Sequence, residues 1–118
     1  MSAETLIYGT LSSAAGVTAL VSTRIYPDFL AQEIVLPAIV TQRSETEYVN
    51  TIHNGIAQAT RITMESWCMA ATRFGAEALA DAAEISLPVG GFRIVNRYPE
   101  FDPETATFAA VVASEIWL

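Results

Sequence analysis

Few residues in this sequence have the chemistry that catalysis or metal binding requires, and they lie far apart along the chain. The one histidine is His53, in the turn-like stretch 53–55, and the one cysteine is Cys68. Catalysis needs a nucleophile, a base and a group that orients them, and neither residue has such partners nearby in the sequence. We therefore interpret His53 as a solvated turn residue. Cys68 alternates with Ile62 and Met64 on one side of an expected strand, which predicts a small buried hydrophobe rather than a reactive thiol.

One expected helix carries three carboxylates on the same side, Glu77, Asp81 and Glu84. They can form a cation site, but an acidic helix face exposed to water is the commoner arrangement, and we interpret them in that way. The glycine pair 90–91 lacks the lysine and the following helix of a phosphate-binding loop. The serine pair 12–13 falls within an expected helix and not on a strained turn. We expect no catalytic residue, no metal site and no cofactor, and hence no enzyme.

Charge argues against a protein that binds nucleic acid. The net charge is -7, and the six basic residues are all arginines. They are spread along the chain, at positions 24, 43, 61, 73, 93 and 97. A protein that grips nucleic acid carries a basic face, because phosphate contacts supply much of the affinity. We therefore expect no direct binding of nucleic acid.

Length and composition fit one folded domain over residues 1–118. Hydrophobic residues make up 52% and charged residues 16%, which is too apolar for a disordered chain. The single cysteine excludes an internal disulfide. No apolar run reaches the roughly 18 to 20 residues that span a bilayer, and the first residues lack the pattern of a signal peptide. We expect a protein without a membrane segment.

The first part of the chain predicts helical structure followed by an extended piece. Apolar residues recur at helical spacing at positions 7, 11 and 14, and Ser2 can cap this helix. Gly16 interrupts the pattern, and residues 17–21 predict a second short helical turn. Residues 24–28 are expected to be extended and to end in a turn.

A β-hairpin and a helix follow. Residues 38–48 and 57–69 predict two antiparallel strands whose long, mobile tip, 49–56, contains the turn pair Asn54-Gly55. Residues 72–87 predict a helix that begins at the cap Thr72. We expect its buried side to be the apolar stripe of Phe74, Ala78, Ala82 and Ile85, with Leu79 alongside.

A second hairpin closes the chain, with strands at 92–98 and 106–117 and a turn at 102–105. The first strand is expected to place Phe92, Ile94 and Tyr98 on one side. The second is expected to place these residues on one side: Phe108, Ala110, Val112 and Ile116. This order of elements predicts an α+β fold, a mostly antiparallel β-sheet of about four strands with two α-helices packed on one face.

Two tryptophans are candidates for contacts between molecules. Trp67 and Trp117 alternate away from the sides that we assign to the core. Aromatic residues are enriched where interfaces bury energy, so both are candidate interface residues. The alternative is a sheet covered on both sides within one chain, which would bury both of them in a core.

Six short motifs occur in an order that resembles one protein family. They are RIYP at 24–27, LPAIVTQ at 36–42, WC at 67–68, AEALADAAEISL at 76–87, DPET at 102–105 and IW at 116–117. This order resembles the tail-completion, or tail terminator, proteins of long-tailed bacteriophages, which are similar to the lambda-type minor tail protein U and have relatives in prophages and gene transfer agents. Thr41 departs from the pattern, because an aromatic residue is common there.

The resemblance implies a structural protein of a particle. Such proteins form a ring, commonly hexameric, that caps the finished tail tube, stops its elongation and joins the tail to the head. The implied partners are other copies of the chain, the tail tube protein and the head-tail connector or stopper protein, while DNA passes through the channel without specific binding. The implied location is the tail of a virion or phage-like particle assembled in the bacterial cytoplasm.

The hairpin tip, about residues 45–56, is the segment that we expect to become ordered when it docks onto a partner. The candidate interface residues are Glu45, Glu47, Tyr48, Asn54, Trp67 and Trp117. Two alternatives stay open. One is another head-tail connector or stopper subunit, and the other is a small-ligand-binding or enzymatic α+β domain, which would show a concave pocket with convergent polar groups.

Overall fold

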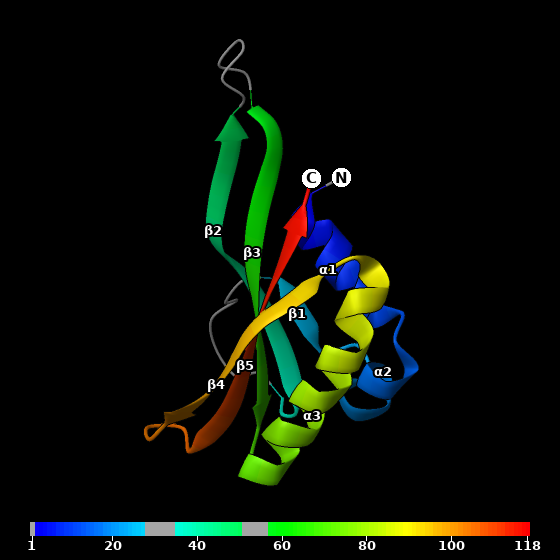
Figure 1. Ribbon diagram of the computed structural model, residues 1–118. Helices are drawn as coiled ribbons and strands as arrows, with labels where there is room; N and C mark the ends of the chain where they lie inside the picture. Colours follow the sequence, from blue (N-terminus) through cyan, green and yellow to red (C-terminus); the bar gives the residue numbers. More distant parts are fainter. Residues whose placement is uncertain (1, 28–34, 51–56) are drawn as a thin grey trace.

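The computed structural model describes residues 2–27, 35–50 and 57–118. In chain order its elements are α1 (Ala3–Ser12), α2 (Ala15–Val21), β1 (Ile25–Pro27), β2 (Ala38–Asn50), β3 (Ala57–Ala70), α3 (Arg73–Ser86), the 3-10 helix η1 (Leu87–Gly90), β4 (Arg93–Asp102) and β5 (Thr107–Trp117) (Figure 1). The strands form one sheet in the order β1-β2-β3-β5-β4. Strand β1 runs parallel to β2, and the other neighbours are antiparallel.

The α+β fold with a mostly antiparallel sheet is therefore confirmed. The described residues form five strands rather than about four, because the extended piece before the first long strand pairs with β2. They form three α-helices rather than two, because the short turn after Gly16 is a helix of its own. Two predicted caps are confirmed: the Ser2 hydroxyl accepts the Thr5 N–H at 3.2 Å, and the Thr72 hydroxyl accepts the Gly75 N–H at 3.0 Å.

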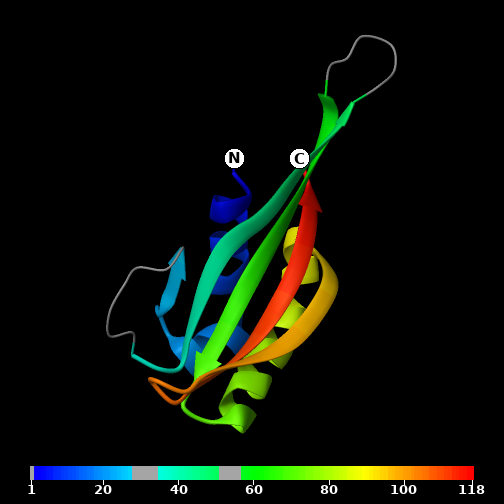
Figure 2. The same ribbon diagram turned by 90° about the vertical axis from the view of Figure 1, so that its left-hand side faces the viewer.

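The helices all pack on the same face of the sheet, which we call the first face (Figure 1). Figure 2 looks onto the opposite side, the second face, on which no helix of the described residues lies. Strand residues alternate between the two faces. On β3, Ile62, Met64 and Cys68 point to the first face, as the sequence predicts, and all three are buried.

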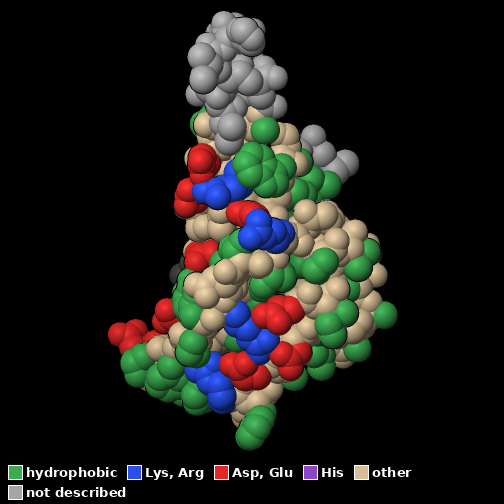
Figure 3. Space-filling view, in the orientation of Figure 1, with side chains coloured by type: hydrophobic (Ala, Val, Ile, Leu, Met, Phe, Trp, Pro, Cys, Tyr) green, Lys and Arg blue, Asp and Glu red, His purple; other side chains and the backbone are tan. Residues whose placement is uncertain are grey.

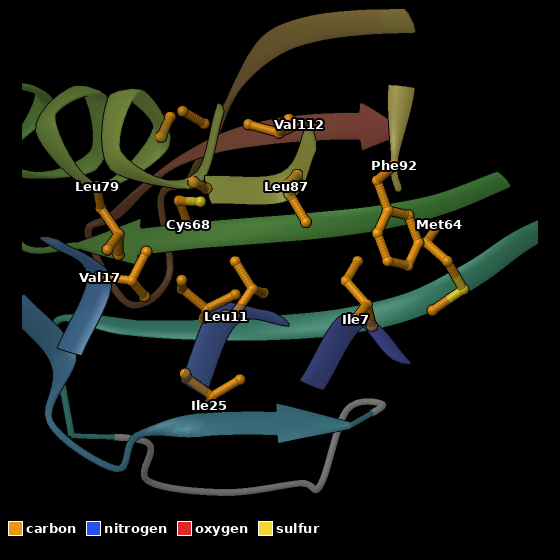
Figure 4. Close-up of a cluster of buried hydrophobic side chains, with 14 of the residues drawn as sticks. Ile7, Leu11, Val17, Ile25, Met64, Cys68, Leu79, Leu87, Phe92 and Val112 are labelled. Carbon is orange, nitrogen blue, oxygen red and sulfur yellow. The ribbon is translucent and has the colours of Figure 1, made fainter. Parts of the chain in front are cut away.

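The core lies between the first face and the helices. Figure 4 shows Met64 of β3 beside Phe92 and near Ile7 of α1, and Leu11 of α1 near Leu87. On β5, Ala110, Val112 and Ile116 join the core and Phe108 packs against it, so the predicted inward side of this strand is confirmed. Burying one large apolar side chain of this kind stabilises the fold by about 1.5 to 3 kcal/mol.

The expected buried side of α3 is wrong for Phe74 and Ile85, which are 89% and 77% exposed, but Leu79 is buried and Ala82 packs against the core as expected. The buried residues of the helix are Ala76, Leu79, Ala80, Ala83 and Ser86. Both stripes have helical spacing, so the sequence pattern does not choose between them. The alanine side packs inward because small side chains let the helix lie close to the sheet, where Cys68 and Ala110 are also small.

Ion pairs hold α3 in this orientation. The Arg97 guanidinium reaches from β4 to Asp81 at 2.7 Å and to Glu84 at 3.4 Å, and it also contacts Glu77. Burial acts to lower the pKa of Arg97, but the hydrogen bonds that it donates to Asp81 and Glu77 raise its pKa above the ordinary value. The three carboxylates are therefore paired with Arg97 rather than simply solvated, which corrects the sequence interpretation.

One residue of β4 lies on the opposite face from the one we expected. Ile94 pairs with Ser114 and packs against the core, but Tyr98 pairs with Val111 and faces the second face. The register shifts between Ile94 and Asn96, so one extra residue is inserted into the strand. A bulge of this kind moves every later side chain to the other face.

Candidate assembly surfaces

Of the two residues singled out for catalytic potential, Cys68 and His53, the structure describes only Cys68. Cys68 is completely buried, and this burial raises the pKa of its thiol to about 12, so it stays protonated and unreactive at neutral pH. His53 lies outside the described residues. Among the residues that the structure describes, no group of three histidine, cysteine or acidic side chains is arranged to hold a metal ion.

The strands β2 and β3 extend beyond the rest of the sheet. Leu118, after the end of β5, exchanges two backbone hydrogen bonds with Thr60, at 3.0 and 2.9 Å. Beyond this point, β2 and β3 pair only with each other and project as a two-stranded ribbon (Figures 1 and 2). We call residues 45–50 and 57–63 the arm; its residues 61–63 still pair with β5 and form its base. The register shift between Arg43 and Glu45 marks its base, where a bulge bends and twists the strands.

The arm carries three of the predicted interface residues. Glu45 and Glu47 lie on the second face, and Tyr48 points to the other side of the ribbon, where it pairs with Thr60 and is 65% exposed. The fourth, Asn54, lies outside the described residues.

Glu45 and Glu47 belong to a network of charges at the base of the arm. The Arg61 guanidinium contacts Glu47 and lies 3.5 Å from Glu45 and 3.8 Å from Glu115. Arg93 of β4 also reaches Glu115, at 3.3 Å. Three carboxylates thus share two guanidinium groups, and one negative charge is left over. The network ties the arm to the end of the sheet, while the side chains of Glu45 and Glu47 remain about half exposed.

The second face has an apolar row across its middle. The cross-strand register aligns Val40, Trp67, Val111 and Tyr98, one from each of four strands. Val40 and Val111 are fully buried, and Trp67 is half-buried. Trp117 is on the same face, at the base of the arm, and is 53% exposed. Both tryptophans therefore point away from the core under the helices, as the sequence predicts.

A hydrogen-bonded carboxylate lies beside this row. Glu65 accepts the Tyr98 hydroxyl at 2.5 Å and the Gln42 amide at 3.2 Å. The bond to Glu65, together with burial, raises the pKa of Tyr98 to about 12. These bonds link β4 to β3 and β2 across the second face.

The helix layer carries an exposed apolar stripe that sequence reasoning placed inside. It consists of Phe74 and Ile85 of α3 with Val89 of η1, and these side chains are 89%, 77% and 88% exposed. We call these three residues the α3 stripe. The helical spacing revealed this side of α3, but only packing against the sheet shows that it faces outward.

An apolar groove lies at the carboxyl end of α3, between α1 and η1. Its volume is about 620 Å³. Its walls are Thr5, Leu6, Gly9, Thr10, Ser13, Ala14, Ser86, Val89 and Gly90, none of which is charged. The walls meet closely at Gly90, where a Cβ atom would lie 2.0 Å from the Thr10 hydroxyl oxygen. Glycine is therefore required for η1 to pack against α1.

The arginines are all engaged with groups of the chain itself. Arg24 donates to the Pro37 carbonyl at 2.9 Å, and Arg43 pairs with Glu4 at 2.7 Å. Arg73 donates to the carbonyl oxygens of Ala109 and Glu100, at 2.9 and 3.1 Å. Positive side chains alternate with negative ones in the view of Figure 3. The described part of the chain therefore presents no cluster of unpaired cations for nucleic acid.

Nor is any helix in the described ranges both long and apolar enough to cross a membrane.

The sequence and the fold were compared with those of known proteins. The family model described as "Tail completion protein gp17" matches residues 5–118. A search of curated proteins finds no match. Among solved structures, a chain described as "Virion of native gene transfer agent (GTA) particle" is similar in fold, with a TM-score of 0.76 and 12% sequence identity. The alignment covers 97% of this chain and 92% of that chain.

Proposed function

The chain belongs to the tail completion protein gp17 family, and from this premise we propose that it forms a ring that caps the tail tube of a phage or phage-like particle. The family resemblance inferred from the sequence motifs is thereby confirmed, and with it a structural role in a phage-type tail. In the proposed function the ring stops tube elongation and joins the tail to the head. The protein works through its surfaces and not through catalysis.

The two ends of the molecule carry different surfaces, which suits a protein that joins two different partners. The arm extends from one end of the sheet, and the turn between β4 and β5 lies at the other end (Figure 1). A cap must match the last ring of the tube on one side and differ from it on the other, because otherwise tube subunits would continue to add. We assign the tube to the arm end, where Tyr48 and Trp117 are exposed beside Glu45 and Glu47.

The turn end has a different surface. Phe101 and Phe108 stack there with ring centroids 4.7 Å apart, and the Arg73 guanidinium lies 5.1 Å from the Phe108 ring centroid. The Asp102 carboxylate accepts the Glu104 N–H at 3.0 Å, which orders the turn. We assign this end to the head-tail connector or stopper protein.

DNA is proposed to pass through the ring without being held. The net charge of -7 favours an acidic channel lining, which repels the phosphates of DNA. The arginines of the chain are paired with its own acidic and carbonyl groups, so few free cations remain to bind phosphate. An assembled ring with a neutral or basic lumen would contradict this part of the proposal. We place assembly in the bacterial cytoplasm, before the finished tail joins the head.

The proposed contact with the tail tube depends on the arm, so a variant with a shortened arm tests it. Tyr48 pairs directly with Thr60, so residues 49–59 can be replaced by Asn-Gly, a two-residue loop that closes an antiparallel hairpin. The change leaves the core between the helices and the first face intact. We expect the variant to fold like the wild type but to fail to cap purified tail tubes, which then grow to uncontrolled lengths in electron micrographs.

A matched control shortens the hairpin at the other end. Asp102 pairs with Thr107, so residues 103–106 can be replaced by the same Asn-Gly loop. This variant should still cap tubes and should lose only head joining. Capping by the shortened arm would show that residues 49–59 are not needed for the tube contact. Binding of the wild type to connector or portal but never to tubes would instead make the chain a stopper subunit.

A further inference from the structure

The α3 stripe begins with a single projecting aromatic side chain. Phe74 lies in the first turn of α3 and is 89% exposed, so it makes little contact with its own chain. Phenylalanine is among the residues enriched at contacts between proteins. Arg97 and Arg73 neutralise part of the charge of the acidic residues that follow on the helix.

The apolar groove lies at the opposite end of the same helix. Ser86 in its wall is twelve residues after Phe74, a separation of about 18 Å along the helix axis. Phe74 therefore cannot reach the groove of its own chain. The groove volume of about 620 Å³ is larger than a phenylalanine side chain needs, and its nine lining residues carry no charge.

We propose that Phe74 of one copy inserts into the α1–η1 groove of the next copy. The occupant that fits best is a second copy of this chain, because the projecting ring and the uncharged groove are both present on one chain. Copies that each carry a net charge of -7 repel one another, so a contact between them must be made where charge is low. The groove, whose lining carries no charge, meets that condition.

The geometry of this contact is head-to-tail. The two surfaces are different and lie at opposite ends of α3, so each copy can use both at once with two different neighbours. A contact of this kind generates a closed ring when the rotation between copies closes. This inference rests on the proposed function, because a ring needs a head-to-tail contact between its copies. The residues that make that contact are Phe74 and the lining of the groove.

One inserted side chain buries far less than the roughly 800 Å² per partner of a stable interface. The free protein is therefore expected to form this contact only transiently, and the test must capture it covalently. We would incorporate the photo-crosslinking residue p-benzoylphenylalanine in place of Phe74, which keeps an aromatic ring at this position. Light and heavy isotope-labelled copies are mixed, irradiated and digested, and mass spectrometry then identifies the cross-linked peptides.

We expect cross-links between different copies that map to the groove, on peptides that contain Gly9 or Val89. The same photo-crosslinker in place of Val95, which is 43% exposed on the edge strand β4, is the control and should not give them. Cross-links from position 74 that map elsewhere, or that are absent at every concentration, would overturn the proposal.

A second variant fills the groove without disturbing the chain around it. A Cβ atom added at Gly9 has nothing within 4 Å, and the same is true of Gly16 in α2, outside the groove. Gly9→Leu should reduce cross-linking from position 74 at least tenfold, whereas Gly16→Leu should leave it unchanged. Equal yields for the two variants would contradict the insertion. Capping of tail tubes is measured separately, so wild-type capping without these cross-links rejects the contact and leaves the proposed function standing.

Discussion

The two faces of the sheet are built from the same five strands but in different ways. The first face meets the helices through apolar side chains such as Met64 and Val112, which are fully buried. The second face combines an apolar row, which includes Trp67, with a carboxylate held by Tyr98 and Gln42. The difference indicates that stability comes mainly from the first face. We propose that the arm and the exposed side chains of the second face, such as Trp117, make contacts with partners.

The strongest test of this division compares two phenylalanines. Phe92 is 2% exposed within the core, and Phe74 is 89% exposed on α3. We expect Phe92→Ala to lower the free energy of unfolding by about 3 to 5 kcal/mol, because it removes buried apolar area and leaves a cavity. Phe74→Ala should change it by less than about 0.5 kcal/mol. Urea denaturation measures both values, and similar losses for the two variants would refute the division.

Phe74 and Phe92 also show how much of the fold can be predicted from the sequence. Alternation predicts which side of β3 is buried, because a strand has only two sides and one of them is clearly apolar. On β5 both sides are apolar and buried, as Val111 and Val112 show. For α3 the spacing is compatible with two stripes, and only packing against the sheet decides that Leu79 points inward and Phe74 outward. The bulge that turns Tyr98 to the second face also leaves no clear signal in the sequence.

The candidate interface residues show the same limit. Their exposure could be anticipated from strand alternation, as for Trp117, but their partners could not. Glu45 and Glu47 lie close together in sequence, yet Arg61 and Glu115, which complete their network, come from different strands. Asn54 falls outside the described residues, so its expected role stays a prediction. The groove joins α1 to η1 across about 75 residues of chain, a contact that no local pattern encodes.

The next largest effect on stability is expected from the contact between α3 and β4. Arg97→Met keeps the length of the side chain but removes its ion pairs with Glu77, Asp81 and Glu84. We expect a loss of about 1 to 2 kcal/mol in urea denaturation, moderated because the carboxylates remain accessible to water. The loss should shrink in 1 M salt, where the Debye length is about 3 Å. If the loss of unfolding free energy were the same at low and high salt, it would come from lost packing and not from lost ion pairs.

A smaller effect is expected on the second face. Tyr98→Phe removes the hydrogen bond to Glu65 and should cost about 1 kcal/mol. The folded-state pKa of Tyr98, about 12, lies above the unfolded value of about 10. The stabilisation is therefore complete below pH 10 and disappears as the pH rises towards 12. Absorbance at about 295 nm follows tyrosinate formation, and the variant should lack the one tyrosine that ionises late. An unchanged titration curve would exclude the bond.

The smallest effect is expected at the rim of the first face, where Glu4 of α1 pairs with Arg43 of β2 at 2.7 Å. The hydrogen bond from Arg43 holds the pKa of Glu4 below its ordinary value, so this pair stabilises the fold at neutral pH and is lost as the pH falls through the lowered pKa. Both side chains are 35% exposed, so Glu4→Gln should cost less than about 1 kcal/mol. Glu104→Gln in the exposed β4–β5 turn is the matched control and should cost nothing measurable. A carboxyl resonance of Glu4 that titrates at the ordinary pKa in NMR would mean that water screens the pair. A cost above that of Tyr98→Phe would mean that the rim, and not the hydrogen bonds of the second face, contributes more to the stability of the sheet.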